Sequence, residues 1–176
     1  LWLGTESGAV KLRSSMFRSY SHMSGLPGSH VIAICRDEVH NTWIGTYNGC
    51  ARITPEGQIV SFGPAEGLPH PTVHAFAGAA RGAVWIGTWE GLVSHERGVV
   101  HSRPVKAFRR DRVIRMLRDH DGSIWCGGDG KILKCGTDGR ILLTLDGKSG
   151  VPDAGICALF QDAGGRLWFG TDARGA

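Results

Sequence analysis

The stretch AVWIGTWEGLV, residues 83–93, decides the fold because its pattern recurs along the whole chain. It joins a tryptophan, an aliphatic residue and Gly-Thr to a second glycine that follows two variable residues. Related stretches begin at residues 1, 42, 124 and 167. The tryptophans follow one another at steps of 41, 42, 40 and 43 residues, as Trp2, Trp43, Trp85, Trp125 and Trp168. A period of this length predicts a series of structural repeats.

One repeat is predicted to contain four short β-strands. Between residues 25 and 62, apolar and β-branched segments at 30–37, 42–47, 50–54 and 58–62 are separated by turn sequences. The Asn48-Gly49 pair between the second and third segments is a strong hairpin signal. The first segment is a short, nearly continuous apolar run, so we expect it to be buried on both faces. Four antiparallel strands per period are typical of a β-propeller blade.

The recurring residues suggest how the blades pack. A tryptophan on each second strand offers a large apolar surface, and we expect it to lie between neighbouring blades. An aspartate stands six residues before Trp43, Trp125 and Trp168, but the corresponding residue before Trp85 is Ala79. The fourth repeat also departs from the pattern, with Ala107-Phe108-Arg109 in place of Gly-Leu-Pro and Gly128 in place of threonine. These changes alter single loops and leave the period intact.

The predicted fold class is therefore all-β, a β-propeller fragment with about four blades of four antiparallel strands. It occupies residues 1–176, and no second domain is predicted. The chain begins on one second strand and ends just after another. We expect a piece of a larger ring rather than a closed four-bladed ring.

Composition sets broad limits on function. The 176 residues are 41% hydrophobic and 20% charged, which is typical of a globular domain. The net charge of +4 is small and mostly scattered, so nucleic-acid binding is not expected. No apolar run approaches the ~20 residues that a membrane helix needs. The five cysteines form no CxxC pair, so neither a zinc site nor a disulfide framework is expected, and no cofactor is predicted.

The motif GLP…V…D..G.LWIGT..GL resembles the two-component regulator propeller repeat. The resemblance covers essentially the whole chain. It implies the periplasmic sensor region of a bacterial hybrid histidine kinase or of a membrane-bound diguanylate cyclase. Such propellers are often seven-bladed and sometimes paired. An immunoglobulin-like domain, a membrane helix and a cytoplasmic signalling domain would then follow in the parent chain, which could be a dimer.

Loops on one face of the propeller are the predicted place of recognition, because binding residues often lie on loops held by a rigid scaffold. The variable loops after the second strands and the loops before the first strands open on that face. The candidate ligand-binding residues are Tyr47, Asn48, His70, Trp89, Glu90, Arg115 and Asp129.

Two of these candidates have features of their own. Trp89 is the one tryptophan outside the repeat register, and beside Glu90 it suits sugar stacking or a bound cation. A ring that merely packs on its own loop is the alternative. Arg115 aligns with alanine in three other repeats, and it would either hold an anion in the channel or bridge to a carboxylate of the next blade.

Two patterns have a structural explanation instead. The basic stretch 105–119 would suit an amphipathic helix, but the repeat register makes it a loop followed by a first strand. His70 and His74 are four residues apart, but they fall in a loop and a strand, so the spacing does not predict a metal site.

The predicted function is a ligand-binding sensor that relays the presence of a small molecule, such as an oligosaccharide, to a downstream kinase or cyclase. Nothing in the chain predicts catalysis. Two alternatives stay open: an enzyme like the streptogramin lyases, which are also propellers, and a scaffold that docks a partner protein.

Overall fold

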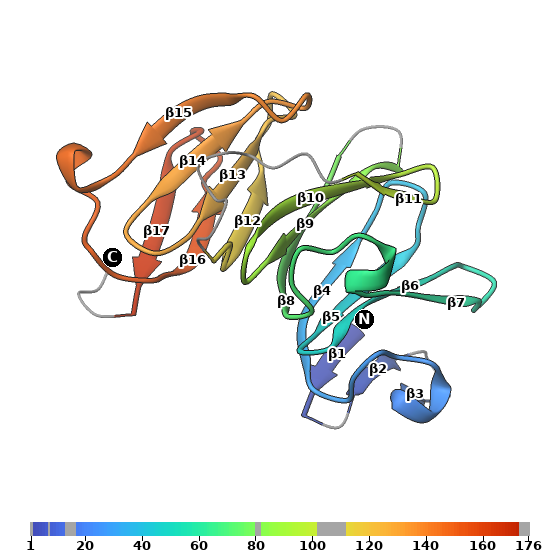
Figure 1. Ribbon diagram of the computed structural model, residues 1–176. Coiled ribbons are helices and arrows are strands. Elements are labelled where there is room, and N and C mark those ends of the chain that lie inside the picture. Colours follow the sequence, from blue (N-terminus) through green and yellow to red (C-terminus); the bar gives the residue numbers. More distant parts are fainter. Residues whose placement is uncertain (1, 7, 13–16, 80–81, 102–111, 173–176) are drawn as a thin grey trace.

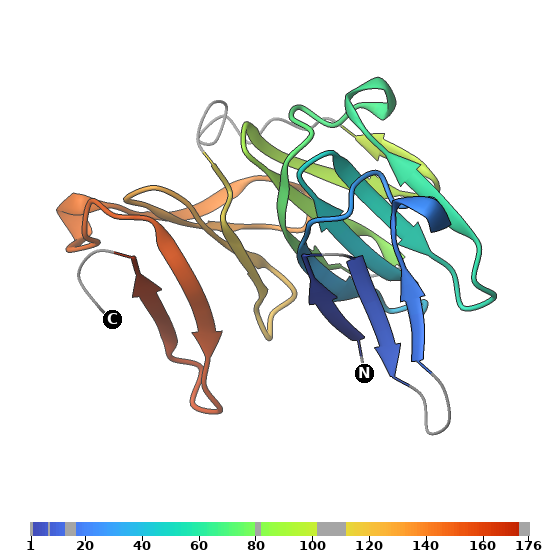
Figure 2. The same ribbon diagram turned by 90° about the horizontal axis from the view of Figure 1, so that it is seen from below.

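The computed structural model describes residues 2–6, 8–12, 17–79, 82–101 and 112–172. They form five antiparallel sheets that lie side by side in the order of the sequence (Figures 1 and 2). Blade I consists of β1 (Trp2–Thr5), β2 (Gly8–Leu12) and β3 (Phe17–Tyr20). Blade II consists of β4 (Val31–Arg36), β5 (Thr42–Thr46), β6 (Gly49–Ile53) and β7 (Ile59–Phe62).

The other three blades continue the series. Blade III consists of β8 (Val73–Gly78), β9 (Val84–Thr88), β10 (Gly91–Glu96) and β11 (Val99–His101). Blade IV consists of β12 (Arg115–Arg118), β13 (Ile124–Gly127), β14 (Ile132–Cys135) and β15 (Ile141–Leu145). Blade V consists of β16 (Ile156–Gln161) and β17 (Leu167–Thr171). The prediction of an all-β propeller arrangement built from four-stranded meanders is confirmed.

Short 3₁₀ helices precede the first strands of three blades, as η1 (His22–Ser24), η2 (Pro64–Glu66) and η5 (Gly147–Ser149). Each ends at a glycine in the left-handed conformation, where the Gly-Leu-Pro or Gly-Val-Pro sequence begins. None of the helices in the described residues is long and apolar enough to cross a membrane.

The Gly-Thr…Gly part of the motif builds the hairpin between the second and third strands. In blade II the Thr46 hydroxyl donates to the carbonyl of Gly49 at 2.9 Å and accepts from the backbone N–H of Asn48 at 3.1 Å. Gly49 has φ +130°, and a Cβ there would lie 2.4 Å from the carbonyl oxygen of Phe62. The turn therefore requires the threonine and the glycine on either side, whereas the two residues between them can vary.

The tryptophans pack between blades, as predicted. Trp43 is 0% exposed, Trp85 3% and Trp125 8%. The apolar cluster around Trp43 combines side chains of blades II and III, among them Phe62 and Phe76. The glycine two residues after this tryptophan, Gly45, lets the next blade approach, because a Cβ there would lie 2.7 Å from the carbonyl oxygen of Val73.

The aspartate before the tryptophan holds the turn between the first and second strands. Asp37 accepts hydrogen bonds from the backbone N–H of Val39 and Asn41 and from the indole Nε1 of Trp43. The corresponding indole bonds in blades IV and V join Trp125 to Asp119 at 2.8 Å and Trp168 to Asp162 at 3.1 Å. The aspartate thus accepts the hydrogen bonds of the turn and of the indole N–H with one side chain.

Two expectations need correction. The first strand of blade II is not buried on both faces, since Val31–Cys35 are half-buried. The first strands of successive blades lie beside one another, β4 next to β8, β8 next to β12 and β12 next to β16 (Figure 1). The expected burial of every repeat tryptophan is wrong for Trp168, which is 54% exposed because no described sheet covers that side of blade V.

Candidate functional site

The fold has two loop-bearing faces. The turns between first and second strands lie on one, here called the turn face. The hairpins between second and third strands lie on the other, the hairpin face, together with the loops before the first strands. Contacts confirm that grouping on the hairpin face, because the backbone N–H of Trp89 donates to the carbonyl of Thr72 at 3.1 Å and the Thr72 hydroxyl donates to the carbonyl of Tyr47 at 3.3 Å.

Trp89 stands at the tip of the β9–β10 hairpin. The Thr88 hydroxyl donates to the carbonyl of Gly91 at 3.0 Å and accepts from the backbone N–H of Glu90 at 3.2 Å. This turn is the same as the one in blade II, so the repeat places the Trp89 ring above the hairpin face. The ring is 42% exposed. An exposed indole of this size is unusual for a residue that serves the core alone.

Arg112 lies over the Trp89 ring and is held by Asp129. The guanidinium carbon is 4.9 Å from the ring centroid, within the range of a cation–π interaction. Arg112 donates two hydrogen bonds to the Asp129 carboxylate, Nε to Oδ2 at 2.8 Å and Nη2 to Oδ1 at 2.5 Å. This bidentate pair raises the pKa of Arg112 and fixes the plane of its guanidinium. Trp89 belongs to blade III, whereas Asp129 lies between β13 and β14 of blade IV.

Two histidines complete the group. The ring of His74 lies 5.4 Å from the Trp89 ring and that of His70 lies 6.2 Å from it. His70 Nδ1 accepts from the backbone N–H of Thr72 at 3.0 Å, which leaves Nε2 as its outer nitrogen. His74 Nε2 is buried with no hydrogen-bond partner. Burial, and then the charges of Arg112, Arg115 and His70, lower the pKa of His74, so its ring is neutral at pH 7.

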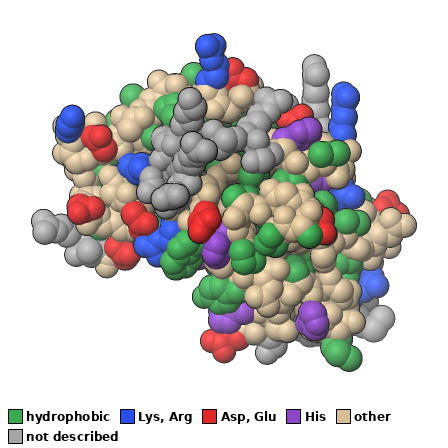
Figure 3. Space-filling model, viewed as in Figure 1, with side chains coloured by type: hydrophobic (Ala, Val, Ile, Leu, Met, Phe, Trp, Pro, Cys, Tyr) green, Lys and Arg blue, Asp and Glu red, His purple; other side chains and the backbone are tan. Residues whose placement is uncertain are grey.

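We call these five side chains the Trp89 cluster: His70, His74, Trp89, Arg112 and Asp129. Figure 3 shows histidine, hydrophobic and charged side chains gathered on this side of the molecule where the middle blades meet. The cluster offers an exposed aromatic surface and a fixed guanidinium, with the neutral, buried imidazole of His74 beside the indole. That combination suits the binding of a solute with a flat apolar side and hydrogen-bonding groups.

Three of the seven predicted site residues are brought together, namely His70, Trp89 and Asp129. Tyr47 lies on the same face but pairs with His30, with ring centroids 4.8 Å apart. Asn48 and Glu90 are the second members of their hairpin pairs, are exposed, and use their backbone N–H groups in the turn. They stay candidates at the edge of the cluster.

Arg115 contacts two backbone carbonyls, and its predicted role in holding an anion stays a prediction. It donates from Nε to the carbonyl of Cys157 at 2.8 Å and from Nη1 to the carbonyl of Ile114 at 2.8 Å. The alignment with Ala33, Ala75 and Ala158 is correct. Arg115 therefore joins the first strands of blades IV and V through a backbone carbonyl, and not through a carboxylate.

Arg112 and His74 were not among the predicted site residues. Arg112 is part of the basic stretch, and its carboxylate partner Asp129 was a candidate, so an oppositely charged pair on adjoining loops was the available signal. In the rest of that stretch, Arg118 at the end of β12 pairs with Glu38 at 2.5 Å. Lys106, Arg109, Arg110 and the segment Ala107-Phe108-Arg109 lie outside the described residues.

Metal binding has no support in the part of the chain that the structure describes, where no group of three or more histidine, cysteine or acidic side chains is placed to hold a metal ion.

Comparison with known proteins agrees with the repeat geometry. Residues 25–48 and 150–173 match the family model described as two component regulator propeller. These segments run from the Gly-Leu-Pro or Gly-Val-Pro turn through the second strand of blades II and V. Blades II and V therefore each contain a segment that matches the two-component regulator propeller repeat. A search of curated proteins found no match.

Solved structures share the arrangement of these propeller repeats. Extracellular domains described as hybrid two component systems of B. thetaiotaomicron match 97% of the chain: BT3049 at 26% identity and TM-score 0.77, and BT4673 at 25% identity and TM-score 0.78. The chain spans 25% and 24% of their lengths. Virginiamycin B lyase from Staphylococcus aureus matches 96% of the chain at 15% identity and TM-score 0.74, over 58% of its own length, which shows a shared fold.

Proposed function

We propose that this propeller is the ligand-sensing region of a bacterial signal-transduction receptor and that it works outside the cytoplasm, in the periplasm. The propeller repeats and the likeness to extracellular domains of two-component systems support this role. The output would be a kinase or cyclase domain of the same parent protein, which the repeats alone do not identify.

The Trp89 cluster is the proposed binding site. The observation that carries the proposal is a 42% exposed Trp89 ring with a guanidinium held above it at 4.9 Å. The arginine is not a general part of the blade, because the corresponding Tyr47 in blade II packs on His30 and has no arginine over its ring among the described residues. A preformed aromatic and cationic surface lowers the entropy cost of binding a solute.

The side chains of the Trp89 cluster indicate the class of ligand. The free part of the indole stacks on the apolar side of a sugar ring. Arg112 and the outer nitrogen of His70 bind carboxylate or sulfate oxygens, for which a guanidinium is well suited. We therefore propose an oligosaccharide that carries acidic groups, which would compete with Asp129 for Arg112.

Signal relay requires that the ligand favour one arrangement of the blades over another. The Trp89 cluster spans a blade boundary, since Trp89 lies in blade III and Asp129 in blade IV. A ligand that draws Arg112 away from Asp129 changes the contact across that boundary. This is the proposed first step of the relay.

A binding experiment with matched tryptophan variants tests the proposal. Isothermal titration with a panel of acidic and neutral oligosaccharides should detect binding that Trp89→Ala reduces by about tenfold or more. Trp168→Ala is the control, because it removes an indole of similar exposure that lies away from the cluster. Equal losses in the two variants, or no binding of any panel member, would refute the assignment.

The same experiment separates two alternatives. A lyase would convert the bound sugar or peptide, and mass spectrometry would then find a new product that disappears in His74→Gln. His74 is the residue to test because its pKa is lowered and its ring lies beside Trp89, although its Nε2 is buried in this structure. A docking scaffold would bind no panel member and would instead retain a partner protein on the hairpin face.

A further inference from the structure

A cavity lies between blades III and IV on the turn face, on the opposite side of the molecule from the Trp89 cluster. Its volume is about 660 Å³, and it is lined from blade III by the start and end of the turn before β9, by Trp85 and by the β10–β11 hairpin. Thr137 of blade IV closes the far side. The size is within the usual range for small-molecule sites.

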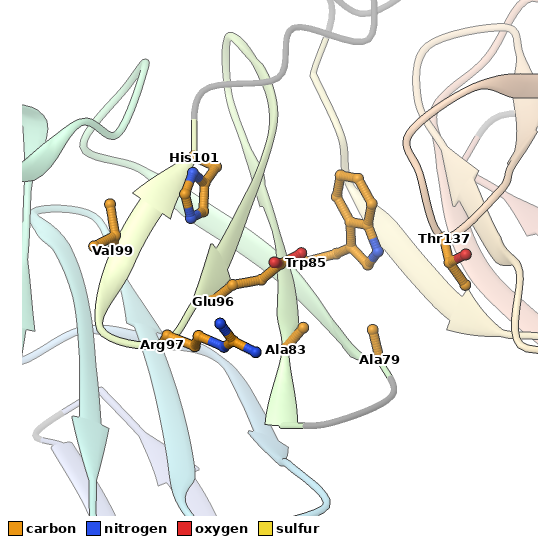
Figure 4. Close-up of a pocket in the computed structure, with 8 residues that line it drawn as sticks. All are labelled: Ala79, Ala83, Trp85, Glu96, Arg97, Val99, His101 and Thr137. Carbon is orange, nitrogen blue, oxygen red and sulfur yellow. The ribbon is translucent and has the colours of Figure 1, made fainter.

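The cavity begins at the place where this repeat lacks its aspartate. In blades II, IV and V the carboxylate of Asp37, Asp119 or Asp162 accepts the indole hydrogen bond of its own blade. In blade III the corresponding residue is Ala79, and a methyl group cannot accept a hydrogen bond. Figure 4 shows the nitrogen of the Trp85 ring on the side of Ala79 and Thr137.

The turn in blade III keeps the geometry that the aspartate serves elsewhere. The backbone N–H of Ala79 donates to the carbonyl of Ala83 at 2.8 Å, as Asp37 does to Asn41 at 3.0 Å. The fourth residue of both turns has a positive φ, +74° at Gly82 and +70° at His40. The donors that meet the carboxylate in blade II therefore have counterparts in blade III.

Those donors are a backbone N–H and an indole N–H. In blade II the N–H of Asn41 reaches Asp37 Oδ1 at 2.8 Å and Nε1 of Trp43 reaches Oδ2 at 2.9 Å. Their counterparts are the N–H of Ala83 and Nε1 of Trp85. Two donors that converge on a missing carboxylate form a place for a carboxylate from solution.

We propose that the cavity beside Trp85 binds a small organic acid whose carboxylate takes the place that the aspartate side chain holds in the other blades. The body of the acid then lies along the β10–β11 hairpin. The half-buried carboxylate of Glu96 faces the same cavity, so the acid must also carry a hydroxyl or ammonium donor there. Arg97 adds positive charge at the rim, and the His101 ring also lines the cavity. The ligand class is thus a hydroxy or amino acid, and this site is independent of the proposed sensing site.

The carboxylate part of the proposal is tested with acetate as the probe. Two-dimensional ¹H–¹⁵N spectra resolve the indole signals, and Trp85→Phe identifies the Trp85 signal by its loss. Titration with sodium acetate should shift that signal saturably, whereas sodium chloride at equal ionic strength should not. In Ala79→Asp, a tethered carboxylate fills the place, so the signal should already be displaced and should no longer respond.

Blade II supplies the matched control. Asp37→Ala creates the same vacancy beside Trp43, and its Trp43 signal should acquire an acetate response that the unaltered chain lacks. If acetate shifts the Trp43 signal of Asp37→Ala but does not shift the Trp85 signal of the unaltered chain, the proposal is overturned. An equal Trp85 response in Ala79→Asp would also overturn it. If Ala79→Asp does not fold, Ala79→Asn supplies a neutral acceptor and should reduce the response.

The ligand class is tested separately with lactate and glycine as probes. At least one of them should bind more tightly than acetate, by about fivefold or more, because Glu96 accepts a hydrogen bond from its hydroxyl or ammonium group. Glu96→Gln should abolish this preference for the ammonium compound, and acetate should bind more tightly because a like charge has been removed from the cavity. Equal binding of the three probes would restrict the site to simple carboxylates and refute the hydroxy or amino acid class.

Discussion

Asp37 accepts a hydrogen bond from the indole Nε1 of Trp43 at 2.9 Å, and both side chains are buried. The same carboxylate accepts from the backbone N–H of Val39 and Asn41. The pair therefore connects the turn of blade II with the side chain that packs against blade III. The recurrence of aspartate six residues before tryptophan is explained by this contact.

Asp37→Ala should lower the free energy of unfolding by about 1–3 kcal/mol, because it leaves a buried indole N–H and two turn N–H groups without their acceptor. Urea denaturation followed by circular dichroism measures the change. Ala79→Asp provides the reverse experiment, since it restores the acceptor in blade III, and it should stabilise the chain or leave it unchanged. If Asp37→Ala has the same free energy of unfolding as the unaltered chain, the structural role given to the aspartate is contradicted.

Trp85→Ala should destabilise the chain by about 3–5 kcal/mol, as expected for removal of a buried aromatic side chain. The Trp85 side chain is 3% exposed and lies in the apolar cluster that joins blades III and IV. Trp168→Ala removes the same side chain from a 54% exposed position and should cost less than about 1 kcal/mol. Similar losses of unfolding free energy in the two variants would show that the tryptophans stabilise their own sheets rather than the contact between blades.

The fold was predictable because its rules are local and repeated. Trp43, Gly45 and Thr46 each have one contact pattern that returns in other blades, so the spacing alone revealed it. The Trp89 cluster was predictable only in part. Trp89 and Asp129 lie on recurring hairpins, whereas Arg112 belongs to a loop that departs from the repeat, and its contact with Trp89 depends on how two blades meet.

The cavity beside Trp85 shows a second limit of sequence analysis. Ala79 was visible as a departure from the aspartate pattern, but the sequence gives no measure of the space that a missing side chain leaves. That space also depends on the β10–β11 hairpin and on Thr137 of the neighbouring blade, which line the cavity together with Ala79. Their distance from Ala79 is set by the packing of the blades, which the sequence does not give.

Stability should fall as the pH drops below about 6.5, because His95 is buried in an aromatic site that disfavours its charged form. Its ring packs edge-on against Trp43 at 4.8 Å and Phe62 at 5.1 Å, and neither ring nitrogen has a hydrogen-bond partner. Burial, followed by the charge of Arg52, lowers the pKa of His95 below its usual value of 6.5. The unfolded chain therefore binds the proton more strongly, and acid favours unfolding.

Urea midpoints at pH 7.5 and pH 5.5 measure this effect. His95→Phe should reduce the difference between the two midpoints, because the variant has no group to protonate at this site. Part of the difference should remain, since the pKa of His74 is lowered as well. A pH dependence that is unchanged in His95→Phe would show that the imidazole is solvated.

Cys157 should be the thiol that reacts fastest in the native chain. It is exposed on β16, whereas Cys50, Cys126 and Cys135 are 0% exposed and Cys35 is half-buried. Burial also raises the pKa of Cys35 and Cys50, so less of the reactive thiolate is present. Alkylation with iodoacetamide at pH 8, followed by peptide mass spectrometry, should find the first label at Cys157. An early label at Cys126 would mean that blade IV opens readily.

Arg112→Gln should raise the pKa of His74 with little effect on stability. After burial, the charge of Arg112 is the next cause that lowers this pKa, so removing the charge should let it rise while burial keeps it below 6.5. The free energy of unfolding should change by less than about 1 kcal/mol, because the Arg112 and Asp129 side chains are 36% and 44% exposed. Titration of the histidine ring protons by NMR measures the pKa, and Arg118→Gln, which removes a similarly exposed arginine paired with Glu38, is the control. An unchanged pKa of His74 in Arg112→Gln would mean that the guanidinium does not lie close to this ring. The proposed binding surface would then lack its central charge.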